Sequence, residues 1–346
     1  MSPYISPLFS FTMILSLLVI LCSTHWVFMW LGLEIGTLAF IPLLTWWHGA
    51  TEVEATVKYF LTQAVAAAIF FFGGLVLLSS ESISGVAQWL GSLGETIILL
   101  SVLMKLGMAP IHYWVIDVVQ GLNYIPGMVL LTWQKLPGLA VLSQLLSESN
   151  SHILLLLAPA SALIGGLGGL GQTQMRKLLG FSSISHLGWL VVGLVINSLL
   201  GAMYFFLYII ISLPVFLSLH ISGGVHLNQL RNALASNSML SISVGVGFLS
   251  LAGLPPFLGF FIKWLVLTHS MTQFLLIAST LLIVGSLISA FYYLRISYLC
   301  LVILAPQQVM AMTNWRNTAK INLISVILLL NIMGLLLVAA LSTFTK

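Results

Sequence analysis

The chain has 346 residues, of which 60% are hydrophobic and 5% are charged, and its mean hydropathy is +1.14. Soluble domains carry about 25% charged residues, so this composition excludes a soluble protein and indicates a polytopic membrane protein. The formal net charge of +4 comes from 11 basic and 7 acidic residues, which are too few and too dispersed for a nucleic-acid interface. We therefore expect membrane lipids, and no nucleic acid, among the partners.

Apolar runs of about 20 residues, the length that crosses a bilayer, predict an all-α fold with about eleven transmembrane helices. In chain order these runs are residues 7–22, 26–47, 56–78, 96–119, 124–146, 153–170, 178–196, 199–222, 240–268, 274–304 and 321–343. The N-terminal segment Met1–Tyr4 lacks the basic region of a signal peptide. The first run is therefore expected to be a retained transmembrane helix.

Two of the predicted helices contain glycine and proline in the middle of the membrane. The fourth is interrupted at Gly107–Pro110 and the ninth at Gly253–Pro256, and proline breaks the hydrogen-bond ladder of a helix. The two breaks lie five helices apart, and an odd offset inverts the topology. Paired broken helices in inverted repeats are typical of transporters. We predict two inverted five-helix repeats, 1–149 and 150–305, and an extra C-terminal transmembrane helix within 306–346.

Basic residues are distributed unevenly between the two sides of the membrane. We call the side that holds the N-terminus side A and the opposite side side B. The loops predicted on side A hold Glu52, Glu54, Asp117, Arg176, Lys177, Arg231, Arg316 and Lys320. Side B holds Glu81, Glu95 and Glu148, with Lys346 at the tail. Because basic loops remain on the cytoplasmic or matrix face, side A is predicted to be that face.

Ionisable residues inside the predicted helices are candidate functional groups, because such residues are costly in a bilayer. Lys105 and Lys135 lie about eight or more residues from either end of their helices, too deep for easy snorkelling. Lys263 follows the second break and is less central. Glu34 could pair with a lysine or form an interhelical hydrogen bond as a protonated acid. Burial disfavours a charged lysine and a nearby carboxylate favours it, so a Glu34–Lys105 pair could switch proton binding.

Other polar or small residues give weaker signals. His112 lies two turns beyond the lysine of the fourth helix if that helix is regular, and is either a relay or a structural residue. His186 lies in a stripe of serines that would join helices or hold water. Glu54 and Lys58 are spaced as a surface ion pair, with a relay as the alternative. Gly165–Gly171 lacks a GK[ST] ending and follows no strand, which favours close helix packing over nucleotide binding.

Five separated blocks of the sequence match one known family. They are Trp30–Glu34, Lys58–Ala64, Lys105–Pro110 with His112 and Trp114, Leu131–Lys135, and Gly253–Pro256 through Lys263. In these blocks, and over essentially the whole chain, the sequence resembles the chain 2 family of antiporter-like membrane subunits of respiratory complex I (NADH:ubiquinone oxidoreductase). Bacterial and plant-type members carry three further N-terminal helices. The chain is therefore similar to the shortened animal mitochondrial type.

The resemblance implies a proton-translocating subunit of the mitochondrial inner membrane, with side A and the N-terminus in the matrix. It implies a glutamate–lysine pair at Glu34 and Lys105, a central lysine at Lys135 and an exit-side lysine at Lys263. Beyond the resemblance, we hypothesise that water and His186 carry the proton from Lys135 to Lys263. Quinone reduction elsewhere in the complex would perturb the pair. The implied partners are other complex I membrane subunits, including neighbouring antiporter-like subunits.

No cofactor is expected in this chain, whereas the complex as a whole uses NADH, FMN, iron–sulfur clusters and ubiquinone. Cys22 and Cys300 lie far apart in the sequence and form no CxxC or Cys/His cluster, so no metal site is expected. Two other functions stay open at this point. One is a stand-alone cation/proton antiporter of the same architecture. The other is a structural membrane spacer whose buried charges hold helices together.

Overall fold

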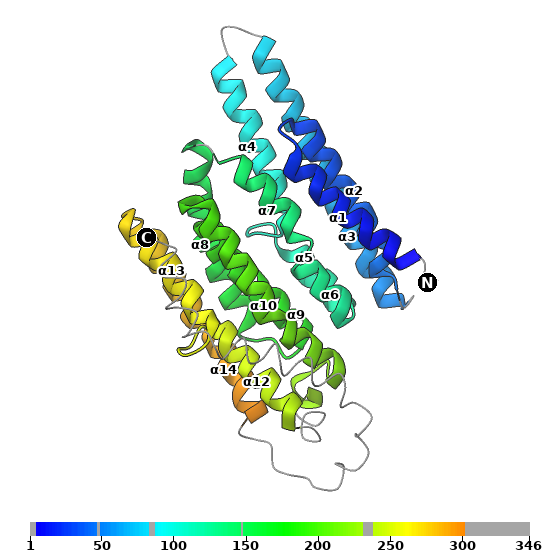
Figure 1. Ribbon diagram of the computed structural model, residues 1–346, viewed down its shortest axis with the longest axis vertical. Helices are drawn as coiled ribbons and strands as arrows, with labels where there is room; N and C mark the ends of the chain where they lie inside the picture. Colours follow the sequence, from blue (N-terminus) through cyan, green and yellow to red (C-terminus); the bar gives the residue numbers. More distant parts are fainter. Residues whose placement is uncertain (1–4, 47–48, 83–86, 147, 231–237, 302–346) are drawn as a thin grey trace. The chain divides into compact units, whose positions relative to one another are not determined.

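The computed structural model describes residues 5–46, 49–82, 87–146, 148–230 and 238–301. In this part the chain is helical, with turns and one isolated β-bridge between Gln174 and His226 (Figure 1). The predicted all-α fold is confirmed. The helix predicted over 321–343, and with it the C-terminal unit 306–346, lies outside the described residues. The chain divides into two compact units, Met1–Leu157 and Ala158–Lys346.

The helices of the first unit begin the chain. They are α1 (Ile5–Cys22), α2 (Trp26–Leu44), α3 (Ala50–Ser82), α4 (Ala87–Leu106), α5 (Tyr113–Gly121), α6 (Tyr124–Leu131) and α7 (Lys135–Gln144). Helices α1, α2 and α3 pack in succession, and α3 also packs against α4 and α5 (Figure 1). Helix α7 contacts α1, α2 and α4. The first unit is thus a bundle in which α2, α3, α4 and α7 share one interior.

The second unit is built around one buried helix. Helix α8 (Glu148–Gly169) runs from the first unit into the second and is followed by α9 (Met175–Ile196), α10 (Ser198–Ser222), α12 (Ser238–Ala252), α13 (Leu258–Thr272) and α14 (Leu276–Leu301). Helix α9 is buried over almost its whole length and contacts α10, α13 and α14. Polar residues of α9 therefore face protein rather than lipid.

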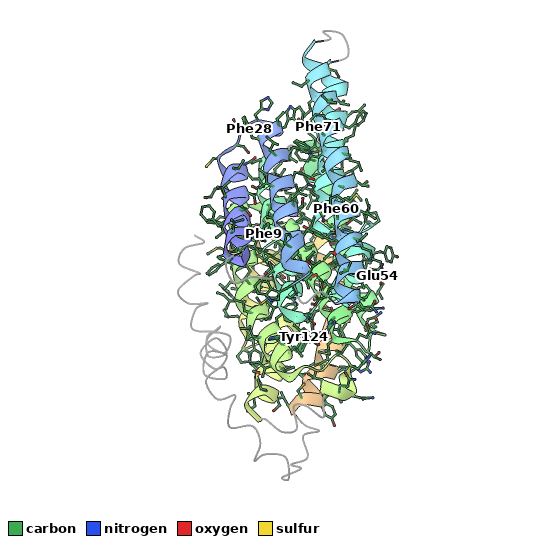
Figure 2. All side chains as sticks on the ribbon, turned by 90° about the vertical axis from the view of Figure 1, so that its right-hand side faces the viewer. Phe9, Phe28, Glu54, Phe60, Phe71 and Tyr124 are labelled. Atoms are coloured by element: carbon green, nitrogen blue, oxygen red, sulfur yellow. The ribbon has the colours of Figure 1, made fainter. Side chains whose placement is uncertain are left out.

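Seven helical stretches of the described part are long and apolar enough to cross a membrane. They are Trp26–Leu44, Ala50–Ser79, Tyr124–Gln144, Asn150–Gly169, Met175–Ile196, Ser198–Ser222 and Leu276–Leu301. The predicted fourth and ninth spans each consist of two helices, α4 with α5 and α12 with α13. Large apolar side chains such as Phe28, Phe60 and Phe71 lie on the outside of the first unit (Figure 2). The chain is a multi-pass membrane protein.

The two breaks have the same backbone geometry. In the first, Gly107 has φ +70°, its N–H donates to the Met104 carbonyl at 3.1 Å, and the next N–H donates to the Leu103 carbonyl at 3.1 Å. In the second, Gly253 has φ +78° and donates to Ser250 at 3.0 Å, and the next N–H reaches the Leu249 carbonyl at 3.4 Å. This is the Schellman motif, which ends a helix on a left-handed residue. The predicted breaks are confirmed at both glycine–proline segments.

A spacing of 146 residues relates the helices of the two units. It separates Gly107 from Gly253, and it also separates the last residues of α4 and α12. When 146 is added to the residue numbers, the range of α1 overlaps that of α8, α2 that of α9, α3 that of α10, α5 that of α13, and the α6–α7 pair that of α14. This order supports an internal repeat. The repeat boundaries at 149/150 and 305/306 stay a prediction.

Five charges that were predicted in side A loops lie within helices, and two of them, Arg176 and Lys177, are in the first turn of α9. Glu54 pairs with Lys58 at 2.7 Å on the exposed surface of α3, which confirms the predicted surface pair (Figure 2). Asp117 is exposed in α5. Glu52 is 3% exposed and accepts a hydrogen bond from Asn123 Nδ2 at 2.5 Å, which ties the turn before α6 to α3. The loop prediction was wrong for these residues because the helices extend beyond the apolar runs.

The glycine-rich run at the end of α8 packs closely on neighbouring helices. A Cβ atom at Gly165 would lie 2.5 Å from the backbone nitrogen of Ser185 in α9. A Cβ atom at Gly169 would lie 2.5 Å from the ring of Tyr292 in α14. These contacts confirm close helix packing as the role of the run.

The first break generates a stability prediction. Gly107→Ala should lower the free energy of unfolding by about 2 kcal/mol or more. Alanine is strained at the left-handed φ of this position, and its Cβ atom would lie 2.1 Å from Val115 Cγ2. Gly223→Ala shares a positive φ of 66° but meets no atom within 4 Å, so it should cost about 1 kcal/mol. Gly127→Ala has neither problem and should be neutral. Thermal unfolding in solubilised membranes would measure this order, and equal melting of all three variants would contradict it.

Candidate functional site

The structure brings Glu34 and Lys105 together. Glu34 lies in the middle of α2, and Lys105 is the residue before the last of α4. Lys105 Nζ lies 3.8 Å from Glu34 Oε2, and the two side chains are 5% and 24% exposed. Neither of these two atoms has a hydrogen-bond partner in the described part of the chain. The pair is therefore a loose ionic contact, since charge-assisted hydrogen bonds measure about 2.7–2.9 Å.

Two side chains from other helices hold the end of α4 in place. A helix end leaves its last carbonyl groups without intrahelical donors. Trp114 Nε1, in α5, donates to the Met104 carbonyl at 3.0 Å, and Gln63 Nε2, in α3, donates to the Lys105 carbonyl at 3.4 Å. The backbone beside Lys105 is thus fixed, whereas its ammonium group stays free to change partners.

Lys135 follows a third helix interruption that the sequence analysis did not predict. Helix α6 ends at Leu131 and α7 begins at Lys135. Between them the N–H of Gln134 donates to the Val129 carbonyl, five residues back, at 3.1 Å. Such wide turns recur at functional sites. The missed signal was Pro137, which clashes with the carbonyl four residues before it and so disfavours a continuous helix.

Lys105 and Lys135 line the same small cavity inside the first unit. Its volume is about 30 Å³, enough for two or three water molecules at roughly 10–15 Å³ each. The other lining residues are Leu33, Thr37, Tyr59, Gln63, Leu106, Trp114, Val115, Leu130, Leu131, Gln134, Pro137 and Gly138. Tyr59, Gln63 and Gln134 supply polar groups that the sequence analysis did not single out. Tyr59 and Gln63 are one turn apart on α3, and this spacing in the sequence could have indicated that both face the same site.

Whereas Lys105 lies in the helix before the first break, Lys263 lies in the helix that follows the second break. It lies in α13 and is buried, and its Nζ donates to the carbonyls of Ala252 and Leu251 at 2.9 and 3.2 Å. These carbonyls end α12, where the helix dipole favours a positive charge. The Nζ atom also lies 5.9 Å from the Trp189 ring. A Cβ atom at Gly253 would come within 3.1 Å of Nζ, so glycine leaves room for the ammonium group.

The two histidines have different surroundings. His186 is buried in α9, and its Nδ1 lies 2.9 Å from the Tyr204 hydroxyl. His112 is buried between α4 and α5, and its Nδ1 donates to the Pro110 carbonyl at 3.1 Å. The break prevents His112 from continuing the helix face of Lys105. A structural role within the first break is the simpler interpretation of His112.

Glu34, Lys105 and Lys135 thus lie in the first unit, and His186 and Lys263 in the second. Trp189, which contacts Lys263, is one turn beyond His186 on α9. Among the described residues no group of three or more His, Cys, Asp or Glu side chains could hold a metal ion. The site contains buried lysines, one carboxylate and a cavity large enough for water. These groups are suited to proton exchange.

Known proteins of one class are similar to this chain in sequence and fold. A family profile described as NADH:quinone oxidoreductase/Mrp antiporter, transmembrane, matches residues 23–289. The fold resembles a chain of respiratory complex I from Thermus thermophilus, with a TM-score of 0.82 and 26% identity, covering 98% of this chain and 80% of that one. A chain of the Mrp complex from Dietzia sp. has a TM-score of 0.72 and 17% identity, covering 83% and 59%. The class is that of antiporter-like membrane proteins.

A full-length relative narrows the assignment. The chain is 64% identical over 346 residues to NADH-ubiquinone oxidoreductase chain 2 of Branchiostoma lanceolatum, covering 100% of both chains. The chain belongs to the NADH-ubiquinone oxidoreductase chain 2 family. The family predicted from the five sequence blocks is confirmed.

The hydrogen bonds of Lys263 generate a second stability prediction. Lys263→Met leaves two buried carbonyl groups without donors, at a cost of about 1–3 kcal/mol each, so the chain should unfold at a lower temperature. Lys105→Met is the matched comparison, since Lys105 Nζ makes no hydrogen bond in the described structure. It should lower the unfolding temperature less. Equal stability of the two variants in thermal unfolding would show that Lys263 does not cap α12.

Proposed function

We propose that this chain is a proton-translocating core membrane subunit of respiratory complex I. The observation that carries the proposal is the loose Glu34–Lys105 pair beside a cavity that Lys135 also lines. A buried ammonium group without a partner is costly, so opening the pair favours release of the proton from Lys105. Water in the cavity can accept that proton and pass it to Lys135. Glu34 acts as the electrostatic switch.

The path continues in the second unit at His186 and Lys263. Lys263 keeps its charge through two backbone carbonyls rather than through a carboxylate. This makes it suited to hold a proton before release on the far side of the membrane. His112 and Lys58 have no assigned step in the path.

The energy for the transfer is proposed to come from quinone reduction elsewhere in the complex. NADH, FMN, iron–sulfur clusters and ubiquinone are then handled by other subunits, and this chain carries no redox centre. Its partners are other complex I membrane subunits, including neighbouring antiporter-like subunits, and membrane lipids. The long exposed rows of apolar side chains on α1, α3 and α14 suit such contacts.

A stand-alone cation/proton antiporter is the weaker alternative. Its structural counterpart, the Mrp chain, is 17% identical and supports only the fold. The 64% identity to a complex I chain favours the complex. A purely structural role is also weaker for Lys105, because its Nζ atom makes no hydrogen bond to the described residues that would hold helices together.

We place the protein in the mitochondrial inner membrane with its N-terminus in the matrix. Arg176 and Lys177 lie at the start of α9, on the side predicted to be side A. Excess basic residues remain on the matrix side of such membranes. Helix α1 then runs from the matrix to side B, where it ends at Cys22.

The pumping proposal predicts the effect of removing either partner of the buried pair. Glu34→Gln and Lys105→Ala should each lower coupled proton pumping by the reconstituted complex about ten-fold or more, since each removes the switch. Glu54→Gln provides the control, because it removes one partner of an exposed ion pair and should leave pumping unchanged. Protons moved and NADH oxidised are measured together in sealed vesicles.

Full pumping and stoichiometry in both Glu34→Gln and Lys105→Ala would sink the proposal. A loss of assembled complex with normal pumping per turnover would support a structural role instead. Comigration of the chain with a very large NADH-oxidising assembly on a native gel separates the complex I subunit from a stand-alone antiporter.

The topology proposal predicts one-sided labelling of a thiol. Cys22 is exposed at the end of α1, whereas Cys300 is buried. A membrane-impermeant thiol reagent should label Cys22 in mitoplasts, where side B faces the medium, and not in inverted vesicles. Cys22→Ser should abolish the signal. Labelling from the matrix side alone would reverse the assigned orientation.

A further inference from the structure

The second unit of the chain carries basic side chains but no acidic ones. Of the 11 Lys and Arg residues in the sequence, eight lie after Leu157, whereas all seven Asp and Glu residues lie before it. The eight are Arg176, Lys177, Arg231, Lys263, Arg295, Arg316, Lys320 and Lys346. No side-chain carboxylate of the same unit can therefore neutralise them.

One of these residues, Arg295, lies in an open groove beside α14. The groove has a volume of about 600 Å³, within the range of roughly 300–1,000 Å³ that is usual for small-molecule sites. One wall consists of Phe291, Arg295 and Tyr298 of α14, and the other of Leu227 and Asn228 in the loop after α10. Arg295 belongs to neither of the ion pairs found among the described residues. The groove thus combines an unpaired cation and two polar side chains with apolar walls.

The loop that forms the second wall is fixed by hydrogen bonds. The N–H of Met175, at the start of α9, donates to the Val225 carbonyl at 3.0 Å, and the N–H of Leu227 donates to the Thr173 carbonyl at 3.1 Å. Within the loop, Gln229 Oε1 accepts a hydrogen bond from the N–H of Val225 at 3.2 Å. Both walls of the groove are therefore held by ordered structure.

The position of Arg295 along α14 corresponds to the depth of lipid phosphates. Helix α14 begins at Leu276, and Arg295 follows 19 residues later, or about 29 Å along the axis at 1.5 Å per residue. The hydrocarbon core of a bilayer is about 30 Å thick. Arg295 therefore lies near the boundary of the core toward predicted side A, where a long basic side chain extends to the head groups.

A row of exposed apolar side chains runs along α14 to this cation. Val284, Leu287, Phe291 and Leu294 are 47%, 67%, 64% and 43% exposed. Their spacing of three or four residues places them on one helix face, and Arg295 lies one turn beyond Phe291. An apolar row that ends in a cation at the membrane boundary is complementary to a lipid with an anionic head group. Basic pockets between transmembrane helices on the matrix side bind such head groups.

We propose that the groove between α14 and the loop after α10 binds a phospholipid with a negatively charged head group. Its phosphate group lies on the Arg295 guanidinium, with the Tyr298 hydroxyl and the Asn228 amide as further donors. Its acyl chains lie along Leu287 and Phe291. An acidic side chain of a neighbouring subunit would also satisfy Arg295, but it would leave the apolar row unexplained. The inference does not depend on the proposed proton pumping.

Photolabelling of the intact complex tests the site. The complex is placed in phosphatidylcholine vesicles that contain a small amount of one photoreactive lipid, either phosphatidylglycerol or phosphatidylcholine. Crosslinks to α14 are then measured by mass spectrometry. Phosphatidylglycerol should label α14 about five-fold more than phosphatidylcholine does, since one basic residue near the membrane surface contributes an effect of that size. Equal labelling by the two lipids overturns the proposal.

Variants of the basic residue show whether its charge causes the preference. Arg295→Gln should label equally with both lipids, whereas Arg295→Lys should keep most of the preference. Lys58→Gln is the matched control, because it removes one positive charge from an exposed ion pair on α3 and should leave the labelling of α14 unchanged. A full preference in Arg295→Gln overturns the proposal. Loss of labelling on addition of inorganic phosphate also overturns it, because the site would then bind free phosphate.

A density map of the natural complex in vesicles with phosphatidylglycerol gives a result that needs no variant. It should show a head-group phosphate within hydrogen-bond distance of the Arg295 guanidinium and a chain along Phe291. A carboxylate of another subunit on Arg295, or a groove without lipid, overturns the proposal.

Discussion

A charged lysine in a bilayer has to be compensated by something other than bulk water, and this chain uses helix ends for that purpose. Lys105 lies in the last turn of α4, and Lys263 donates to the last carbonyls of α12. Both positions meet the negative end of a helix dipole. Lys135 is instead the first residue of α7, where the dipole opposes a positive charge. The helix dipoles therefore favour the positive charge of the two outer lysines and oppose that of the lysine between them in sequence.

The two breaks share a backbone motif but complete it with different donors. In the first unit the neutral indole of Trp114 supplies an N–H to the end of α4. In the second unit the ammonium group of Lys263 does so for α12. Lys105 is therefore released from capping its own helix and can pair with Glu34. Lys263 has to serve as cap and proton carrier together, which links its protonation to the integrity of the second break.

The sequence predicted those features that depend on local chemistry. Glycine followed by proline located both breaks, and the cost of a buried charge singled out Glu34 and Lys105. The interruption before Lys135 was missed because the proline that signals it lies two residues inside the next helix. The burial of Glu52 and the contact of Lys263 with Trp189 depend on which helices pack together. Periodicity in one chain does not specify such contacts between distant segments.

The length of the Glu34–Lys105 contact matters for how it can act. At about 4 Å and an effective dielectric constant near 20, two unit charges interact by roughly 4 kcal/mol. A direct charge-assisted hydrogen bond would add about 1.5–3 kcal/mol and hold the pair closed. A two-state element needs about 5.5 kcal/mol to move from mostly open to mostly closed. The ionic contact at 3.8 Å, at roughly 4 kcal/mol, is weaker than that 5.5 kcal/mol. Modest changes around Glu34 therefore suffice to open the pair and to release a proton toward Lys135.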